Sequence, residues 1–248
     1  MNQKENEASA AESADALDAG EMSLIEHLEE LRERIIKMLL AVAIGSGIAW
    51  CWKEELLAAL MEPAGKLYYM QPAEAFFTYM KVAIFAGFLL MSPFVFYQVW
   101  RFFVPALTRR ERLVISIGLP SSLLLFFAGI AFAFFFVLPV GMKFLMGFTT
   151  DTLQPLFSIE KYFDFLLAFL LPFGFIFEMP LIIIVLAQMG IVSSAFLQKQ
   201  QRMVIFLAFV IAAVISPTPD AWSQIMIAVP MVLLYEGSYF FVRYLMRK

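Results

Sequence analysis

The sequence predicts an all-α membrane protein in which six helices cross the bilayer. Hydrophobic residues make up 62% of the 248 positions, and the mean hydropathy is +0.80. A soluble domain of this length cannot bury that much apolar surface. The apolar residues form continuous runs and do not alternate with polar ones, which argues against a transmembrane β-barrel. Segments rich in proline, glycine or charge divide the runs into six stretches.

The first 22 residues differ in composition from the rest of the chain. Nearly half of the 21 acidic residues lie before position 34, and residues 1–22 contain few apolar side chains. This composition is typical of a disordered segment. An acidic start without a short apolar core does not fit a secretory signal peptide. We therefore expect a disordered acidic cytoplasmic tail at 1–22 and a single six-helix membrane domain at 23–248.

A charged helix precedes the first span and continues into it without a break. Ser23 and Glu26 form a capping box from which this helix can start. Its apolar residues recur at helical spacing, while Glu26, Glu30 and Glu33 lie on another face. Two interpretations of the acidic face stay open. It is either the solvated side of an amphipathic helix on the bilayer surface or a docking site for a cationic partner.

The six apolar stretches give the expected spans in chain order: residues 35–52, 76–103, 113–137, 159–189, 203–215 and 224–242. Apolar patches within 53–75 predict a short amphipathic helix between the first two spans. We expect a loop at 139–158, where Pro139 and Pro155 interrupt the chain. At 1.5 Å per residue the fifth stretch would be about 20 Å long, whereas the hydrocarbon core is about 30 Å thick. The sixth is only just long enough.

The basic residues indicate how the chain is oriented in the membrane. If the N-terminus is inside, one side of the membrane receives every arginine, and the other side receives only lysines. The positive-inside rule then places both termini in the cytoplasm. The residues on the expected cytoplasmic side include Arg32, Arg34, Arg101, Arg109, Arg110, Arg112, Arg202, Arg243 and Arg247, and those on the other side are Lys53, Lys66, Lys81, Lys143 and Lys161.

Glu178 is the acidic residue that lies deepest in an expected span. A carboxylate at that depth costs several kcal/mol unless it is protonated, paired or solvated. One interpretation is a neutral acid bonded to a backbone carbonyl that Pro172 or Pro180 leaves free. The other is a functional group that faces a wet cavity or a partner. Gln224 and Glu236, near the last span, are weaker versions of the same signal.

Glu111 lies among arginines in the turn after the second span. It could form a salt bridge within the turn, which contributes little when it is exposed. Alternatively, Glu111 and Glu30 share one membrane face and act together. Two neighbouring carboxylates suit a pair of guanidinium groups, because each can accept a bidentate pair of hydrogen bonds.

Single residues exclude several classes of enzyme. Cys51 is the one cysteine and His27 the one histidine, and His27 precedes the first span. A thiolate metal site and an intramembrane serine–histidine protease are therefore excluded. An aspartyl protease would need two buried aspartates, and Asp164 and Asp220 lie near span ends. We expect no enzyme activity, cofactor, metal site or nucleic-acid partner.

Linked motifs run along the chain at residues 27–34 (HLEELRER), 75–77 (AFF) with Lys81, 92–100 (SPFVFYQVW), 105–107 (PAL), 111–112 (ER), 177–180 (FEMP), 216–220 (SPTPD), 223–224 (SQ) and 227–230 (IAVP). In this order they resemble the TatC family, the multi-spanning subunit of the twin-arginine protein translocase. The resemblance covers residues 23–245. It departs from the family pattern after Arg112, where Leu113 replaces a second basic residue.

The resemblance implies a receptor for twin-arginine signal peptides on folded cargo. The receptor would also be the core scaffold of a multi-copy complex in the cell membrane, which works with TatA- and TatB-type single-span partners on the proton motive force. Membrane lipid would surround a cupped bundle whose fifth and sixth helices are short. Glu30 and Glu111 match the carboxylates that receive the arginine pair. The other matching positions are His27, Arg32, Phe102 and Arg112 for the recognition surface, and Glu178, Ser216 and Gln224 for the intramembrane partner site.

A second hypothesis is a secondary transporter or proton channel that uses Glu178. A transporter is expected to carry substrate-binding charges at the midplane, on broken helices in paired halves. Here Glu178 stands alone near the midplane, and no internal repeat is visible in the sequence. The receptor hypothesis therefore accounts for more of the charged residues.

Overall fold

A computed structural model describes residues 24–103, 112–147, 156–216 and 220–246. The acidic tail expected at 1–22 lies outside these residues. Within them, six helical segments are long and apolar enough to span a membrane, which confirms the six-span prediction. These segments are Leu28–Ala64, Glu74–Phe102, Gly118–Phe144, Ile159–Gln188, Ser194–Ile215 and Ala221–Leu245.

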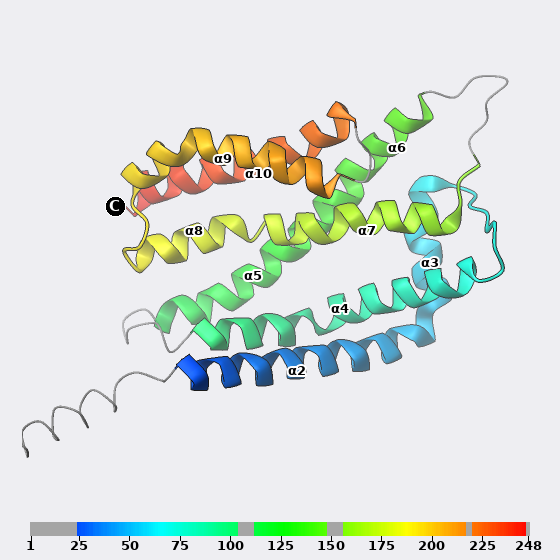
Figure 1. The fold of residues 1–248 in the computed structure, drawn as a ribbon, viewed down its shortest axis with the longest axis horizontal. Coiled ribbons are helices and arrows are strands. Elements are labelled where there is room, and N and C mark those ends of the chain that lie inside the picture. Colours follow the sequence, from blue (N-terminus) through cyan, green and yellow to red (C-terminus); the bar gives the residue numbers. More distant parts are fainter. Residues whose placement is uncertain (1–23, 104–111, 148–155, 217–219, 247–248) are drawn as a thin grey trace, which may run out of the picture.

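The segments are built from helices that Figure 1 labels in chain order. The first half of the chain contains α2 (Leu24–Ala49), the 3₁₀ turns η1 (Trp50–Trp52) and η2 (Glu62–Ala64) on either side of α3 (Lys53–Met61), α4 (Glu74–Phe103) and α5 (Arg112–Phe132). The second half contains the π-helical segment η4 (Ala133–Val137), α6 (Leu138–Met146), α7 (Ile159–Ile176), α8 (Met179–Gln188), α9 (Ser194–Ile215), α10 (Ala221–Phe240) and the π-helical segment η5 (Phe241–Leu245).

Two ends of the molecule are distinguished by the helix termini that meet there (Figure 1). The start of α2, the end of α4, the start of α5, the α8–α9 turn and the end of α10 lie together, and we call this the Glu30 end. The opposite end carries α3 and α6. Six crossings bring the described chain back to the end from which it started.

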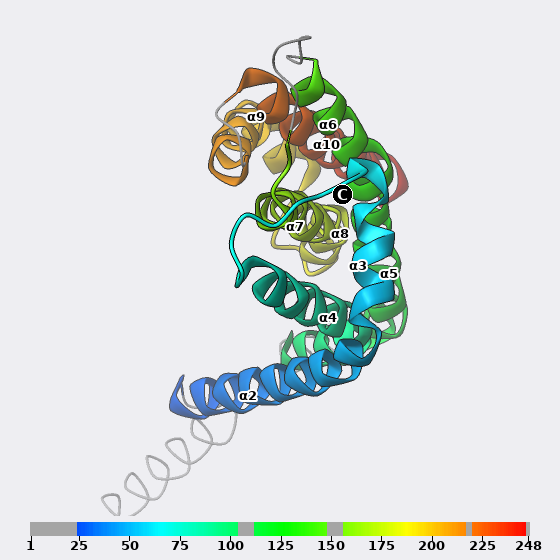
Figure 2. The same ribbon diagram turned by 90° about the vertical axis from the view of Figure 1, so that its right-hand side faces the viewer.

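The helices α2 and α4 lie side by side and approach each other closely (Figures 1 and 2). Glycines make this possible: a Cβ atom on Gly45 would lie 2.6 Å from the carbonyl oxygen of Gly87. A Cβ atom on Gly87 would lie 2.3 Å from the backbone nitrogen of Ser46. Small residues permit such backbone contact between helices in a membrane, where van der Waals packing drives association. The first two spans are therefore held at a fixed crossing.

The short helix expected between the first two spans is α3, which buries Leu57. The connection that follows is joined to the start of α7. Tyr68 pairs with that segment through two backbone hydrogen bonds, from its N–H to Phe157 O at 3.0 Å and from Ile159 N–H to its carbonyl at 2.8 Å. Glu74 accepts a hydrogen bond from Met70 N–H at 2.7 Å. These contacts order the end of the molecule opposite to Glu30.

The prediction of a loop at 139–158 is wrong for the first part of that range. The third crossing continues without a break through η4 into α6, which ends only at Met146. Pro139 lies just after the π-helical segment, and the N–H of Leu138 before it pairs with the carbonyl of Ala133, five residues back. The wider π-helical turn before it changes the hydrogen-bond register, a feature common near irregular positions in helices.

The helices form an open, curved wall and not a closed bundle (Figure 2). In this view α2 lies at one edge, α9 and α10 at the other, and α4 and α7 between them. The central helix α7 buries Phe163, Leu166 and Phe173 completely. At the far edge, the fifth and sixth segments have 22 and 25 residues and are the shortest of the six, as we expected. The expected length of about 20 Å for the fifth is wrong, because α9 begins at Ser194 in the polar stretch before the apolar run and is about 33 Å long at 1.5 Å per residue.

Candidate functional site: two carboxyl groups

Glu30 lies in the second turn of α2 and is held by an arginine of its own helix. Arg34, one turn further on, donates from Nε to Glu30 Oε1 at 3.1 Å, and its Nη2 donates to the same oxygen. Residues four apart on a helix are neighbours, so the local fold brings the two together. The remaining donor nitrogen of Arg34, Nη1, reaches α4 and donates to Gln98 Oε1 at 3.3 Å. The Glu30 carboxyl is thereby fixed to two helices.

The second carboxylate oxygen of Glu30, Oε2, has a different environment. It is covered from solvent, and within the described part of the chain it has no hydrogen-bond partner. A carboxylate can accept about four hydrogen bonds. Burial without partners is costly for a polar atom. Glu30 therefore keeps an acceptor that a donor from outside these residues can satisfy.

The other predicted recognition residues are distributed around the Glu30 end. Arg32 is exposed, and Phe102 is half-buried one turn beyond Gln98 on α4. His27 belongs to α2, and Arg112 is the first residue of α5, at the same end of the molecule. Glu111 lies outside the described residues, so its pairing with Glu30 stays a prediction.

The acidic face of α2 carries its own counter-charges. Glu33 is exposed and accepts a hydrogen bond from Lys37 at 2.7 Å, so it repeats the arrangement of Glu30 and Arg34 on the surface. Sequence analysis did not assign a role to Arg34 or Gln98. The spacing of four residues from Glu30 to Arg34 was available as a signal. No sequence pattern indicated the contact between Arg34 and Gln98, which lie 64 residues apart.

Glu178 occupies the turn between α7 and α8, within the fourth span. Glu178 is 7% exposed, and its side-chain oxygen Oε1 has no hydrogen-bond partner among the described residues. Pro180 lies in the first turn of α8, so the helix breaks at this position. The side chain of Ser122 on α5 lies beside the carboxyl group and interacts with it. Trp100 on α4 in turn donates from Nε1 to Ser122 Oγ at 2.8 Å. Neither Trp100 nor Ser122 was singled out from the sequence.

Ser216 ends α9, and Gln224 helps to join the last two spans. The N–H of Ser216 donates to Ala212 O at 2.8 Å and ends α9. The amide of Gln224 on α10 donates from Nε2 to Phe209 O of α9 at 2.9 Å. Asp220 caps the start of α10 by accepting from Ser223 N–H at 2.7 Å. The predicted partner position Gln224 therefore also helps to hold the α9–α10 pair together.

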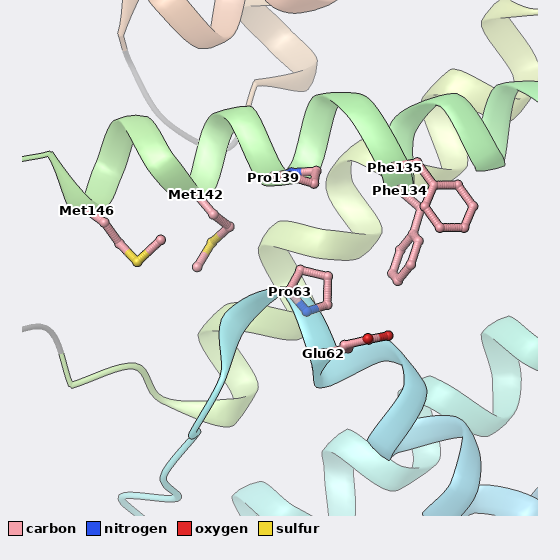
Figure 3. Close-up of a pocket in the computed structure, with 7 residues that line it drawn as sticks. All are labelled: Glu62, Pro63, Phe134, Phe135, Pro139, Met142 and Met146. Carbon is pink, nitrogen blue, oxygen red and sulfur yellow. The ribbon is translucent and has the colours of Figure 1, made fainter.

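A separate pocket of about 320 Å³ lies at the end opposite to Glu30 (Figure 3). It opens between η2 and the η4–α6 segment, and its lining is mostly apolar. The residues around it are Glu62, Pro63, Phe134, Phe135, Pro139, Met142 and Met146. None of the predicted site residues contributes to this lining.

Comparison with known proteins decides the family. Residues 26–230 match the family model of the Sec-independent protein translocase protein (TatC). The chain belongs to the TatC family. Among TatC relatives, the protein of Carboxydothermus hydrogenoformans is 40% identical over 231 residues, which is 92% of this chain and 95% of the relative. The protein of Aquifex aeolicus is 39% identical over 235 residues, which is 92% of this chain and 97% of the relative.

The fold matches TatC as well. A crystal structure described as the twin-arginine translocase receptor TatC, in the detergent DDM, superposes with a TM-score of 0.79 at 39% sequence identity. The match covers 88% of this chain and 99% of that one. A second crystal structure of the same receptor gives a TM-score of 0.76. TatC membership makes this chain a multi-pass membrane subunit of a Sec-independent protein translocase, which is a transport component and not an enzyme.

Proposed function

We propose that this TatC chain is the receptor for twin-arginine signal peptides and the core scaffold of the translocase that exports folded proteins. The observation that carries the proposal is the Glu30 carboxyl, which has one oxygen held by Arg34 and the other without a hydrogen-bond partner in the described part of the chain. A relative with 39% identity is itself described as the twin-arginine translocase receptor, which supports this assignment.

The chemistry of Glu30 suits a guanidinium group. Oε2 is shielded from water, where a charge-assisted hydrogen bond is stronger than on an open surface. Arginine presents several donors in a planar fork, whereas lysine is a compact, strongly hydrated charge. We infer that one arginine of the peptide binds Glu30 and the other binds Glu111. His27, Arg32, Phe102 and Arg112 surround the peptide in this proposal.

The arginines of the chain support the proposed orientation. Arg32 and Arg34 lie near the start of α2 and Arg101 near the end of α4, at the Glu30 end. Toward the opposite end, Lys53 begins α3, Lys66 follows η2 and Lys81 lies near the start of α4. By the positive-inside rule the Glu30 end faces the cytoplasm. Both termini are then cytoplasmic, and the chain resides in the cell membrane, where a signal peptide can reach Glu30 before export.

Glu178 completes the proposal within the bilayer. Its unpartnered Oε1, together with Gln224 and Ser216 on the shorter fifth and sixth spans, would face TatA- and TatB-type single-span partners. Buried carboxyl groups within membranes commonly serve transport steps. In this proposal several TatC copies and their partners move folded cargo with energy from the proton motive force.

Peptide binding to the detergent-solubilised chain tests the receptor proposal. A labelled peptide with two consecutive arginines should bind, and the same peptide with two lysines should bind at least about tenfold more weakly, because bidentate contacts are lost. Glu30→Gln should reduce affinity for the arginine peptide to a similar extent. The matched control is Glu33→Gln, one turn away on the exposed surface. Equal binding of both peptides by all three proteins would reject the proposal.

A further inference from the structure

Trp100 connects the end of α4 to the intramembrane carboxyl group through one intermediate residue. Its Nε1–H donates to Ser122 Oγ at 2.8 Å, and the Ser122 side chain lies beside the Glu178 carboxyl group. Ser122 is 2% exposed and Glu178 is 7% exposed, so water is largely excluded from this chain of contacts. Three helical segments, α4, α5 and the α7–α8 turn, meet at these three side chains.

The surface of α5 is shaped to receive the indole ring. A Cβ atom on Gly118 would lie 2.4 Å from Trp100 Cη2 and 2.7 Å from Cζ2. The ring therefore packs directly on the backbone of α5 at Gly118. Ser122 lies one turn further along the same face of α5, where it meets the indole N–H. The glycine and the serine together fix both the plane of the ring and the direction of its donor.

The direction of the hydrogen bonds follows from the donors available. The indole nitrogen of tryptophan can only donate, whereas a serine hydroxyl has one proton to donate and lone pairs that accept. Because Ser122 Oγ accepts from Trp100, its own proton is free to point to the Glu178 carboxyl. A hydroxyl without this anchor could rotate to a backbone carbonyl of its own helix, as serine commonly does. Trp100 thus determines where the Ser122 proton is directed.

We propose that Trp100, acting through Ser122, is a positioning residue for Glu178. In this proposal the Ser122 hydroxyl, oriented by Trp100, donates to the Glu178 carboxyl group and so fixes its orientation. The orientation of Oε1, which is buried and has no partner in the described structure, is then fixed as well. The inference rests on the proposed function in one respect, since it assumes that export uses Glu178. The hydrogen-bond geometry itself can be tested without that assumption.

The experiment compares conservative variants by two readouts. Trp100→Phe removes the donor but keeps an aromatic ring over Gly118, and Ser122→Ala removes the intermediate hydroxyl. Ser122→Thr restores a hydroxyl. Trp222→Phe is the matched control, because Trp222 is exposed and stacks on Phe144 with ring centroids 5.9 Å apart. The first readout is the infrared band of the Glu178 carboxyl group, isolated by subtracting the spectrum of Glu178→Gln. The second is the export rate of a twin-arginine cargo in membrane vesicles.

The proposal predicts a shifted Glu178 band in Ser122→Ala and in Trp100→Phe, and an unshifted band in Trp222→Phe. Export should fall about two- to tenfold in the first two variants, the effect of one hydrogen bond, and Ser122→Thr should recover most of it. A merely structural tryptophan would lower thermal stability without moving the band, and an unmoved band in both variants overturns the proposal. If the band shifts but Glu178→Gln exports normally, the proposed use of Glu178 is wrong and the positioning role stands.

Discussion

Arg34 directs two donor nitrogens to a single oxygen of Glu30, and the other oxygen of that carboxylate has no partner among the residues that the structure describes. The ion pair therefore fixes the carboxyl group without using all of its acceptor capacity. In the proposed function, a peptide arginine would therefore bind the other oxygen without displacing Arg34. Because Arg34 is itself held by Gln98, the position of Glu30 depends on the packing of α2 against α4.

Gln98→Leu should weaken the binding of a twin-arginine peptide about two- to tenfold. The change removes the acceptor that holds Arg34, at a cost typical of one hydrogen bond, and Glu30 loses its fixed orientation. The measurement is peptide affinity by fluorescence anisotropy. Gln198→Leu, an exposed glutamine on α9, is the control and should leave affinity unchanged. Unaltered affinity in Gln98→Leu would show that Arg34 does not orient Glu30 through α4.

Glu178→Gln should leave peptide affinity unchanged and reduce export of folded cargo by at least about tenfold. The amide cannot take part in chemistry that needs a carboxyl group, and it lies far from the Glu30 end. Export into membrane vesicles measures the effect. Glu236→Gln is the control, because Glu236 accepts a hydrogen bond from Gln201 at 2.6 Å and an amide oxygen can still accept it. Equal export by both variants would make Glu178 structural. Uptake of a small labelled solute that requires Glu178 would favour a transporter.

Gly45→Ala should destabilise the protein by about 1–3 kcal/mol, the range for forcing extra atoms into a packed contact. The new Cβ would lie 2.6 Å from the carbonyl oxygen of Gly87, and backbone atoms cannot move aside easily. Thermal unfolding in detergent measures the change. Gly47→Ala, two residues along the same helix, has no atom within 4 Å of its Cβ position and should be neutral or slightly stabilising. Equal effects at both positions would contradict the close α2–α4 crossing.

Lys81→Met should reduce stability by no more than about 1 kcal/mol. Lys81 on α4 contacts Asp164 at 2.6 Å and Glu160 at 3.4 Å on α7, but these side chains are one-third to one-half exposed, and exposed pairs contribute little. The difference from the unmodified protein should shrink further at high salt, since ions screen exposed charges. A loss of several kcal/mol that persists at high salt would mean that the ion cluster is more buried than the structure indicates.

The sequence predicted the number and order of the spans because continuous apolar runs record them directly. It also drew attention to Glu178, because a charged residue stands out against the apolar neighbours of its span, whereas Glu30 was selected among several acidic residues by the family resemblance; both site roles stay predictions. It did not predict how these carboxyl groups are held. Gln98 and Trp100 belong to the motif at 92–100, but the motif does not reveal their contacts with Arg34 and Ser122, which arise only when helices distant in the chain pack together.

The wrong prediction of a loop at Pro139, in the third crossing, has a similar cause. Pro139 is a helix breaker in most contexts, so the sequence indicated a loop there. In the structure the π-helical segment Ala133–Val137 precedes it, and the proline falls in the first turn of α6. Hydrogen-bond register decides whether a proline ends a helix, and composition does not reveal that register.

A double-mutant cycle between the peptide and Glu30 tests the receptor proposal most directly. Affinity is measured for the twin-arginine peptide and for a peptide with one arginine changed to glutamine, each against the unmodified chain and Glu30→Gln. If one of the two arginines contacts Glu30 directly, the two changes together should reduce affinity by less than the product of the two single reductions. For that arginine the difference should be about tenfold or more. Glu33→Gln in the same cycle should show no such coupling. Losses that multiply to within about twofold for both arginines would contradict the contact.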